Sequence, residues 1–263
     1  MNAFKRMTVV ALASVAVVPA IRAQVPGMPL FTNPRYATGL RVHADIGQPT
    51  DKGTSLGDLT VIQGGANFVL GPIGIDASVG TLRNNIQALQ TCTAGAPANC
   101  NTNSKLTASA LAQLRIMGGG PSNLSLSVFG GASTDLTAYD ALDCSSFTTV
   151  TTPTLAQCQA QKAALTVKQL NIPVGAALGL RIPLGLASLN LWGSARENFT
   201  SFANCNGTCP SAGSGKVRFA FGADLPVFRI LSVRAAYDTG KDINDQTTSV
   251  WGVGASIGIG GMR

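Results

Sequence analysis

Residues 36–48, with the sequence YATGLRVHADIGQ, decide the fold of this chain. Their even positions carry apolar or small side chains and their odd positions carry polar side chains or glycine: Thr38, Leu40, Val42, Ala44 and Ile46 against Gly39, Arg41, His43, Asp45 and Gly47. Alternation with a period of two predicts a β-strand with one apolar face and one charged face. In a soluble sheet the charged face meets water, whereas in a closed membrane barrel it faces the lumen.

The chain opens with a segment of the secretory type. Residues 1–23 have a basic start at Lys5 and Arg6, then an apolar run, then small residues before a polar one. This is the layout of a cleaved signal peptide, and the apolar run is shorter than the roughly 20 residues of a membrane-spanning helix. We expect cleavage after Ala23, with Ala20 as the second choice and an uncleaved anchor as the alternative. The expected organisation is a signal peptide over 1–23, a short lead over 24–35 and one barrel domain over 36–263.

The composition favours a membrane barrel over a large soluble β domain, which is the alternative. Charged residues make up 12% of the chain, about half the usual share, and the mean hydropathy is +0.25. No second long apolar run exists in the sequence. A transmembrane β-barrel has this composition because only alternate residues face lipid. The net charge of +7 includes the basic residues of the signal segment, so the mature chain is too weakly basic to predict nucleic-acid binding.

The six cysteines form three local couples. They are Cys92 with Cys100, Cys144 with Cys158, and Cys205 with Cys209. Each couple lies in a polar stretch without alternation, and an exported chain is expected to oxidise them to disulfides. A zinc site is not expected, because His43 is the only histidine and the spacings are not those of CxxC pairs. The disulfides either protect exposed chain or shape a surface for contact with another protein, cell or glycan.

About ten stretches show strand patterns. They cover residues 36–48, 57–70, 73–80, 106–117, 124–129, 172–182, 188–196, 217–224, 232–238 and 249–259. Long polar connections follow the odd-numbered strands, and tight turns such as Gly71-Pro72 follow the even-numbered ones. In the third long connection, residues 154–165 are predicted to form a short helix. This order predicts an antiparallel up-and-down barrel with the long, cysteine-bearing loops on one rim and both termini on the short-turn rim.

This pattern resembles the small bacterial outer-membrane β-barrel proteins, the class that includes OmpA-like barrels. The resemblance covers the mature chain but lies in the pattern and not in a diagnostic motif. Gly254, Ile257 and Ile259 fit the terminal strand of that class, whereas residues 260–263 replace its usual aromatic ending. The resemblance implies an outer-membrane location, extracellular loops and periplasmic termini. It also implies outer-membrane lipid and the barrel-assembly machinery as partners.

The predicted inward face collects charged side chains. They are Arg41, His43, Asp45, Asp76, Arg115, Arg181, Arg196, Arg218, Asp224, Arg234 and Asp238. Because charges removed from water must pair, we expect an Arg and Asp network that braces the wall and largely fills the lumen. The alternative is a narrow passive channel with a mild anion preference, because arginines outnumber carboxylates.

Catalytic interpretations of the sequence are weak. His43 and Asp45 share one strand face and could act as a general base, but the other acidic and histidine positions of omptin-type barrel proteases have no match. Gly254 to Gly258 matches GxSxG without the helix that this motif needs, and residues 213–216 lack the remainder of a phosphate loop. We therefore predict a structural or surface-interaction barrel without enzymatic activity or cofactor, with a surface enzyme as the remaining alternative.

Overall fold

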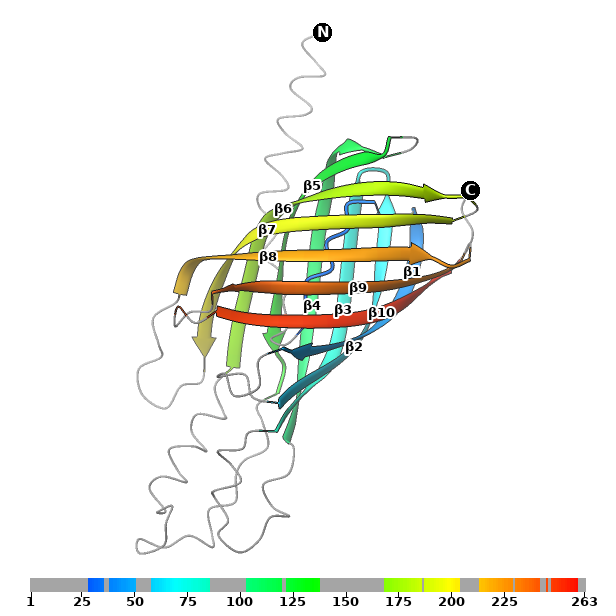
Figure 1. Cartoon of the computed structure of the whole chain (residues 1–263). Helices are drawn as coiled ribbons and strands as arrows, with labels where there is room; N and C mark the ends of the chain where they lie inside the picture. Colours follow the sequence, from blue (N-terminus) through cyan, green and yellow to red (C-terminus); the bar gives the residue numbers. More distant parts are fainter. Residues whose placement is uncertain are drawn as a thin grey trace, which may run out of the picture.

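The chain folds into a closed barrel of ten antiparallel strands, seen in a computed structural model (Figure 1). The structure describes residues 28–35, 38–50, 58–85, 103–119, 122–137, 168–185, 187–203, 213–228, 230–241, 245 and 247–259. Every strand pairs with its neighbours in the sequence, and β1 closes the barrel by pairing with β10. The predicted fold class is thereby confirmed.

The strands run in simple order around the wall. Their bounds are β1 Gly39–Pro49, β2 Asp58–Leu70, β3 Ile73–Asn85, β4 Asn103–Gly118, β5 Leu124–Asp135, β6 Lys168–Leu184, β7 Ala187–Ala203, β8 Gly213–Pro226, β9 Leu231–Lys241 and β10 Thr247–Ile259. Tight turns follow the even-numbered strands up to β8, with Gly71 and Gly185 at positive φ. The odd-numbered strands end at the opposite rim, where the longer or more polar connections of the sequence begin (Figure 1).

Several strands are longer than the hydrophobic pattern predicts. Residues 83–105 were expected to form a loop, yet β3 runs on to Asn85 and β4 begins at Asn103. Backbone pairing of Arg83 with Ser104 and of Asn84 with Asn103 extends the ladder there. Alternation of apolar residues therefore marks the height of the apolar belt and not the ends of the strands, because a ladder needs only backbone groups. The ends of β5, β6, β7 and β8 next to the long connections are also longer than predicted.

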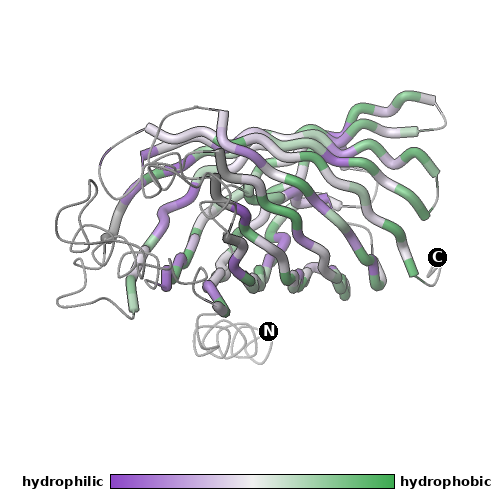
Figure 2. Tube along the Cα trace, turned by 90° about the horizontal axis from the view of Figure 1, so that it is seen from below, coloured by the Kyte–Doolittle hydropathy of each residue, from purple (hydrophilic) through white to green (hydrophobic). Residues whose placement is uncertain are grey.

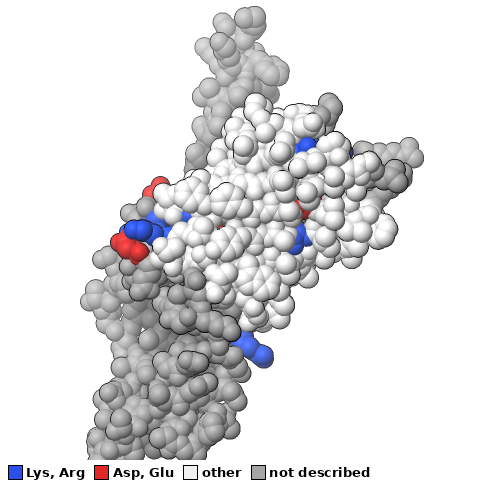
Figure 3. Space-filling model, in the orientation of Figure 1, with Lys and Arg blue, Asp and Glu red and all other residues white. Residues whose placement is uncertain are grey.

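The outer surface of the barrel is apolar. Leu40, Val42 and Ile46 of β1 point outward with about 38–39% of their surface exposed, and each of the other nine strands also exposes large apolar side chains. Hydrophobic and hydrophilic residues alternate along the strands in Figure 2. Few charged side chains appear on the wall in Figure 3. Because His43 and Asp45 are only 7% and 3% exposed, the charged face of β1 points into the lumen.

Some predictions fall outside the described residues. These are the signal peptide over 1–23, all six cysteines and the short helix over 154–165. Among the residues that the structure describes, no helix is long and apolar enough to cross a membrane.

Candidate functional site

The lumen contains a stretch of the chain's own lead, residues 28–35, called the lumen segment below (Figure 1). At one end, Met28 packs against Val61 and Leu82, a few residues from the long-connection ends of β2 and β3. At the other end, a guanidinium nitrogen of Arg35 donates to the carbonyl of Ser122 in the β4–β5 turn. The segment therefore runs opposite to β1 and reaches from near the long-connection rim to the short-turn rim.

Its length matches the wall that surrounds it. An extended chain of this length spans at most about 26–29 Å. The apolar band of an outer-membrane barrel is about 25 Å tall. Eight of the twelve residues of the expected lead, 28–35, thus lie inside the barrel, which was predicted to be largely filled by the charged network.

Apolar side chains of the lumen segment sit in sockets of the wall. Leu30 packs with Leu111, Phe129 and Ala177, which come from β4, β5 and β6. On the other side, Phe31 packs against the cluster around Trp192 of β7. Consecutive residues thus use opposite sides of the lumen, as expected for an extended chain.

Two wall glycines make room for the two prolines of the segment. A Cβ on Gly179 would lie 2.7 Å from the ring of Pro34, and a Cβ on Gly252 would lie 2.7 Å from the ring of Pro29. Real Cβ atoms do not approach other heavy atoms this closely. Both prolines are fully buried, so the wall at these two places fits this segment closely.

Polar side chains of the wall bind the backbone of the lumen segment. The amide of Leu30 donates to Asp238 Oδ2 at 3.4 Å, and Gln113 Nε2 donates to the carbonyl of Thr32 at 3.1 Å. Arg115 Nε donates to the carbonyl of Pro34 at 3.2 Å. These contacts supply partners for buried backbone groups that no strand ladder pairs, which would otherwise cost free energy.

A side-chain contact adds to this anchoring. Asn33 Nδ2 donates to Asp224 Oδ2 at 2.9 Å, and the indole nitrogen of Trp192 donates to the same oxygen at 2.8 Å. Asp224 was predicted to belong to the Arg and Asp network of the lumen. Its carboxyl group accepts hydrogen bonds from the segment and from an aromatic side chain, and it also lies within electrostatic range of Arg234 and Arg41.

Asp238 holds the most buried charge cluster of the lumen. Its carboxylate lies 2.5 Å from Arg196 Nη2 and 3.0 Å from Arg218 Nη2, and the side chains of Asp238 and Arg196 have no exposed surface. Arg218 also donates to the hydroxyl of Thr248 at 2.8 Å. This cluster joins β7, β8, β9 and β10, and it also binds the lumen segment through the amide of Leu30.

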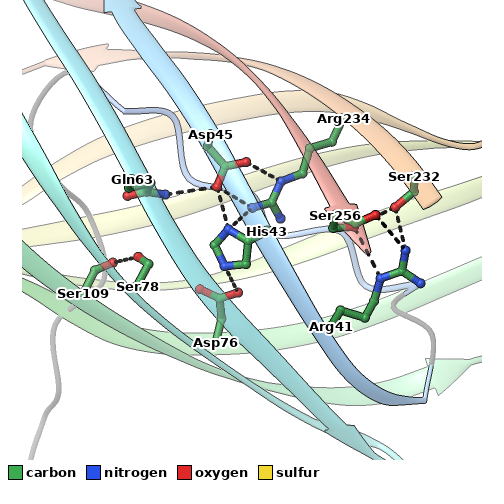
Figure 4. A network of polar contacts seen from close by, with 10 residues as sticks. All are labelled: Arg41, His43, Asp45, Gln63, Asp76, Ser78, Ser109, Ser232, Arg234 and Ser256. Atoms are coloured by element: carbon green, nitrogen blue, oxygen red, sulfur yellow. Dashed lines mark hydrogen bonds and ion pairs between the residues drawn. The ribbon is translucent and has the colours of Figure 1, made fainter. Parts of the chain in front are cut away.

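A second cluster surrounds Asp45 (Figure 4). Arg234 contacts both carboxylate oxygens of Asp45 at 2.7 Å, and His43 Nδ1 lies 2.7 Å from Oδ2. On the far side of the ring, His43 Nε2 lies 3.0 Å from Asp76. The cluster thus links β1, β3 and β9 across the closure of the barrel. It also reaches the lumen segment, because the guanidinium carbon of Arg234 lies 4.3 Å from the centre of the Phe31 ring.

The other predicted positions behave differently. Arg41 donates to Ser232 Oγ at 2.9 Å and to Ser256 Oγ at 3.3 Å, so the serine of the GxSxG match is a wall residue here (Figure 4). Arg115 binds the segment, as described above. Arg181 lies within electrostatic range of Arg35 at the short-turn rim and is not joined to the Asp45 or Asp238 clusters.

An ion pair near the long-connection rim was not predicted from the sequence. Lys105 Nζ lies 2.6 Å from Asp135 Oδ2, and the amide of Gln169 donates to the same oxygen. All three positions were assigned to loops. The period of two in β5 continues to Asp135 and places it on the same face as Ser127 and Phe129. This pattern could have predicted an inward position for Asp135.

Two small cavities lie beside the lumen segment, among the residues that the structure describes. A cavity of about 60 Å³ is lined by Asp76, Asp224 and Arg234 together with Phe31 and Asn33, and another of about 30 Å³ lies nearby. Such spaces hold a few water molecules at most. Within the described part of the chain, no group of three or more His, Cys, Asp or Glu side chains could hold a metal ion.

No family model matches the chain, and no curated protein matches it in sequence. Its fold is similar to that of the β domain of the Bordetella autotransporter BrkA, at a TM-score of 0.47 and 12% identity over 85% of this chain and 100% of that one. It is also similar to the translocator domain of the autotransporter NalP from Neisseria meningitidis, at 0.40 and 14% over 85% and 90%. A third similar structure is Neisserial surface protein A, at 0.34 and 10% over 84% and 98%. These likenesses are too low to say what this chain binds or does.

Proposed function

We propose that this chain is an integral outer-membrane barrel with a structural or surface-interaction role, closed by its own lumen segment. The apolar outer wall of all ten strands supports a lipid environment, since such a surface is unfavourable in water. The lumen segment is the observation that supports a closed barrel. Its side chains fill sockets of the wall, and wall side chains bind its backbone, from near one rim to the other.

The orientation belongs to the same proposal. The long connections face the outside of the cell and the short turns face the periplasm, as the resemblance implies and as the sorting of connections supports. Outer-membrane lipid and the barrel-assembly machinery are then its partners, and an extracellular protein or glycan binds the long connections. Loops carry such contacts more often than the wall that holds them.

A narrow passive channel is the second candidate. Arginines outnumber carboxylates among the predicted lumen positions, and two small polar cavities lie beside the lumen segment. Their volumes of about 60 and 30 Å³ are too small for solvated ions to pass through these two cavities. In the proposed closed barrel, conduction requires the lumen segment to move.

We propose no catalytic role for His43. Each of its ring nitrogens faces a carboxylate oxygen, of Asp45 or of Asp76, at 2.7 and 3.0 Å. Its side chain is only 2% exposed, so the ring braces β1 against its surroundings. A general base needs a nitrogen directed at a reacting proton, and this arrangement directs neither nitrogen at a nucleophile.

Planar-bilayer conductance of the refolded protein tests the proposal. The closed barrel predicts no reproducible single-channel steps for the wild-type chain. Regular steps with a preference for anions would instead establish the passive channel. Extraction by detergent only, together with heat-modifiable migration on a gel, tests membrane residence separately, and a freely soluble mature chain would contradict it.

A further inference from the structure

We infer that the lumen is a binding site for an extended peptide, and that the lumen segment is the ligand this site holds within its own chain. The inference deepens the proposed function, on which it rests for the closed barrel. The inner face of the wall then recognises a peptide in addition to bracing the strands.

Side chains of the wall hold the backbone of the segment. Gln113 and Arg115 donate to its carbonyls, and Asp238 accepts from its amide, so all three contacts come from side chains of the wall. A peptide bound in this way can leave without breaking any strand ladder. Backbone contacts of this kind provide affinity that depends little on the side chains of the peptide.

The sockets of the wall select particular side chains of a bound peptide. An aromatic ring fits between the Trp192 cluster and the Arg234 guanidinium, and an aliphatic side chain next to it fits the socket of Leu111 and Phe129. Apolar sockets with a few placed polar groups are the usual design of ligand sites. A braced wall without a ligand would have no reason to pair an aromatic socket with an aliphatic one on the opposite side.

Two glycines and two carboxyl groups of the wall add to this selectivity. Gly179 and Gly252 leave hollows where the prolines of the segment lie, and proline in an extended chain reduces the entropy lost on binding. The carboxylate of Asp224 accepts from the Asn33 amide, and that of Asp238 accepts from a backbone amide. The site therefore takes a peptide that presents amide donors to these two carboxyl groups.

Covalent attachment to β1 strengthens this binding. A short tether gives a ligand an effective concentration on the order of mM, so even a modest intrinsic affinity keeps the segment in place. Cutting the tether removes this advantage and reveals the affinity of the site itself.

The test separates the segment from the wall after folding. A protease site with a flexible spacer is inserted between Arg35 and Thr38, the protein is refolded in detergent, and the cut is verified on a denaturing gel. We expect the amino-terminal fragment to co-elute with the barrel in gel filtration. A labelled synthetic peptide of residues 28–35 should replace it saturably, whereas a peptide with the same residues in scrambled order should not.

Wall and segment variants sharpen this test. Asp224→Asn should release the cut fragment at least tenfold faster, while Leu40→Ala on the outer wall should leave its release unchanged. A second arm uses the uncut chain with Phe31→Ala and Asn33→Ala, which weaken the segment and leave every wall residue in place. This double variant should bind the labelled peptide, and the wild-type chain should bind much less.

The outcomes are distinct from those of the proposed function. Immediate loss of the cut fragment from a barrel that keeps heat-modifiable migration, with no peptide uptake in either arm, would overturn the inference. Because the uncut wild-type chain would still show no conductance, the closed barrel would survive that result. Conductance of the uncut wild-type chain would instead contradict the proposed function.

Discussion

The lumen segment and strand β1 are consecutive in the chain and both run along the height of the barrel, but they are held in different ways. β1 pairs its backbone with β2 on one side and with β10 on the other. The lumen segment has no ladder, and wall side chains bind its backbone groups. One stretch is therefore part of the barrel, and the other is a ligand of it.

This difference has a physical consequence for the two stretches. Removing β1 would open two rows of backbone hydrogen bonds and leave unpaired edges, which a membrane does not tolerate. Removing the lumen segment would break a few side-chain contacts and leave all the strands paired. Substitutions in the segment should therefore change conductance through the lumen more than they change the stability of the wall.

The largest effect is expected at Asp238, where the wall cluster and the segment meet. Asp238→Asn removes the negative charge that the buried guanidinium groups of Arg196 and Arg218 share. Loss of one partner from a buried ion pair costs about 3–5 kcal/mol. Urea titration of the protein refolded in lipid vesicles, followed by tryptophan fluorescence, should show this loss. An unchanged midpoint would mean that the cluster does not brace the wall.

A smaller effect is expected at Gly179. In Gly179→Ala the new Cβ would lie 2.7 Å from Pro34 of the segment and 2.9 Å from Ser125 Oγ of the wall, and such overpacking costs about 1–3 kcal/mol. The proline can move aside, so the barrel should keep heat-modifiable migration while conductance steps appear in planar bilayers. Gly64→Ala is the matched control, because its Cβ faces outward with its nearest neighbour at 3.7 Å. Equal behaviour of the two variants would contradict a closely fitted segment.

Asn33→Ala should have a smaller effect still. It removes the hydrogen bond to Asp224, and a typical intramolecular hydrogen bond contributes about 0.5–1.5 kcal/mol. The Asp224 oxygen keeps its bond from Trp192, so it is not left unsatisfied. Intermittent conductance with an unchanged urea midpoint is the expected result. A lower midpoint without conductance would show that the segment supports the wall and does not close it.

The smallest effect is expected outside the lumen, at Asp245 in the β9–β10 connection. Its hydrogen bond and ion pair with Lys216, at 2.5 Å, lower the pKa of the Asp245 carboxyl. A lowered carboxyl pKa contributes stability above the ordinary value of about 3.9 and loses it as the pH falls through the folded value. Solvent screens such an exposed pair, so Asp245→Asn should leave the urea midpoint unchanged at pH 7. A clear shift of the urea midpoint at pH 7 would show instead that the pair of Asp245 and Lys216 stabilises the barrel.

The fold could be predicted because two simple patterns agree. Alternation along residues such as Leu40, Val42 and Ile46 fixes the outward face, and the order of long and short connections fixes the up-and-down topology. The strand ends could not be predicted, because Asn85 and Asn103 extend a ladder through backbone groups alone. Hydropathy carries no signal for a pairing that does not bury apolar surface.

The lumen was less predictable than the wall. The parity of each strand placed the charged residues inward, but it could not say that Arg234 pairs with Asp45 or that Asp224 binds Asn33, which lie 189 and 191 positions apart. The lumen segment was missed because Pro29 and Pro34 interrupt any strand pattern. An apolar, proline-containing stretch between the predicted signal peptide and the first strand was the available signal, since such a stretch must be buried somewhere.

The central claim is that residues 28–35 lie inside the barrel, and a photocrosslink tests it most directly. A diazirine analogue of leucine at position 30 has nearly the size of the native side chain and reacts with whatever it contacts. Illumination of the refolded protein should crosslink it to peptides that contain Leu111, Phe129 or Ala177, as mass spectrometry would identify. Reaction with detergent or water alone, or with long-connection peptides only, would contradict the account.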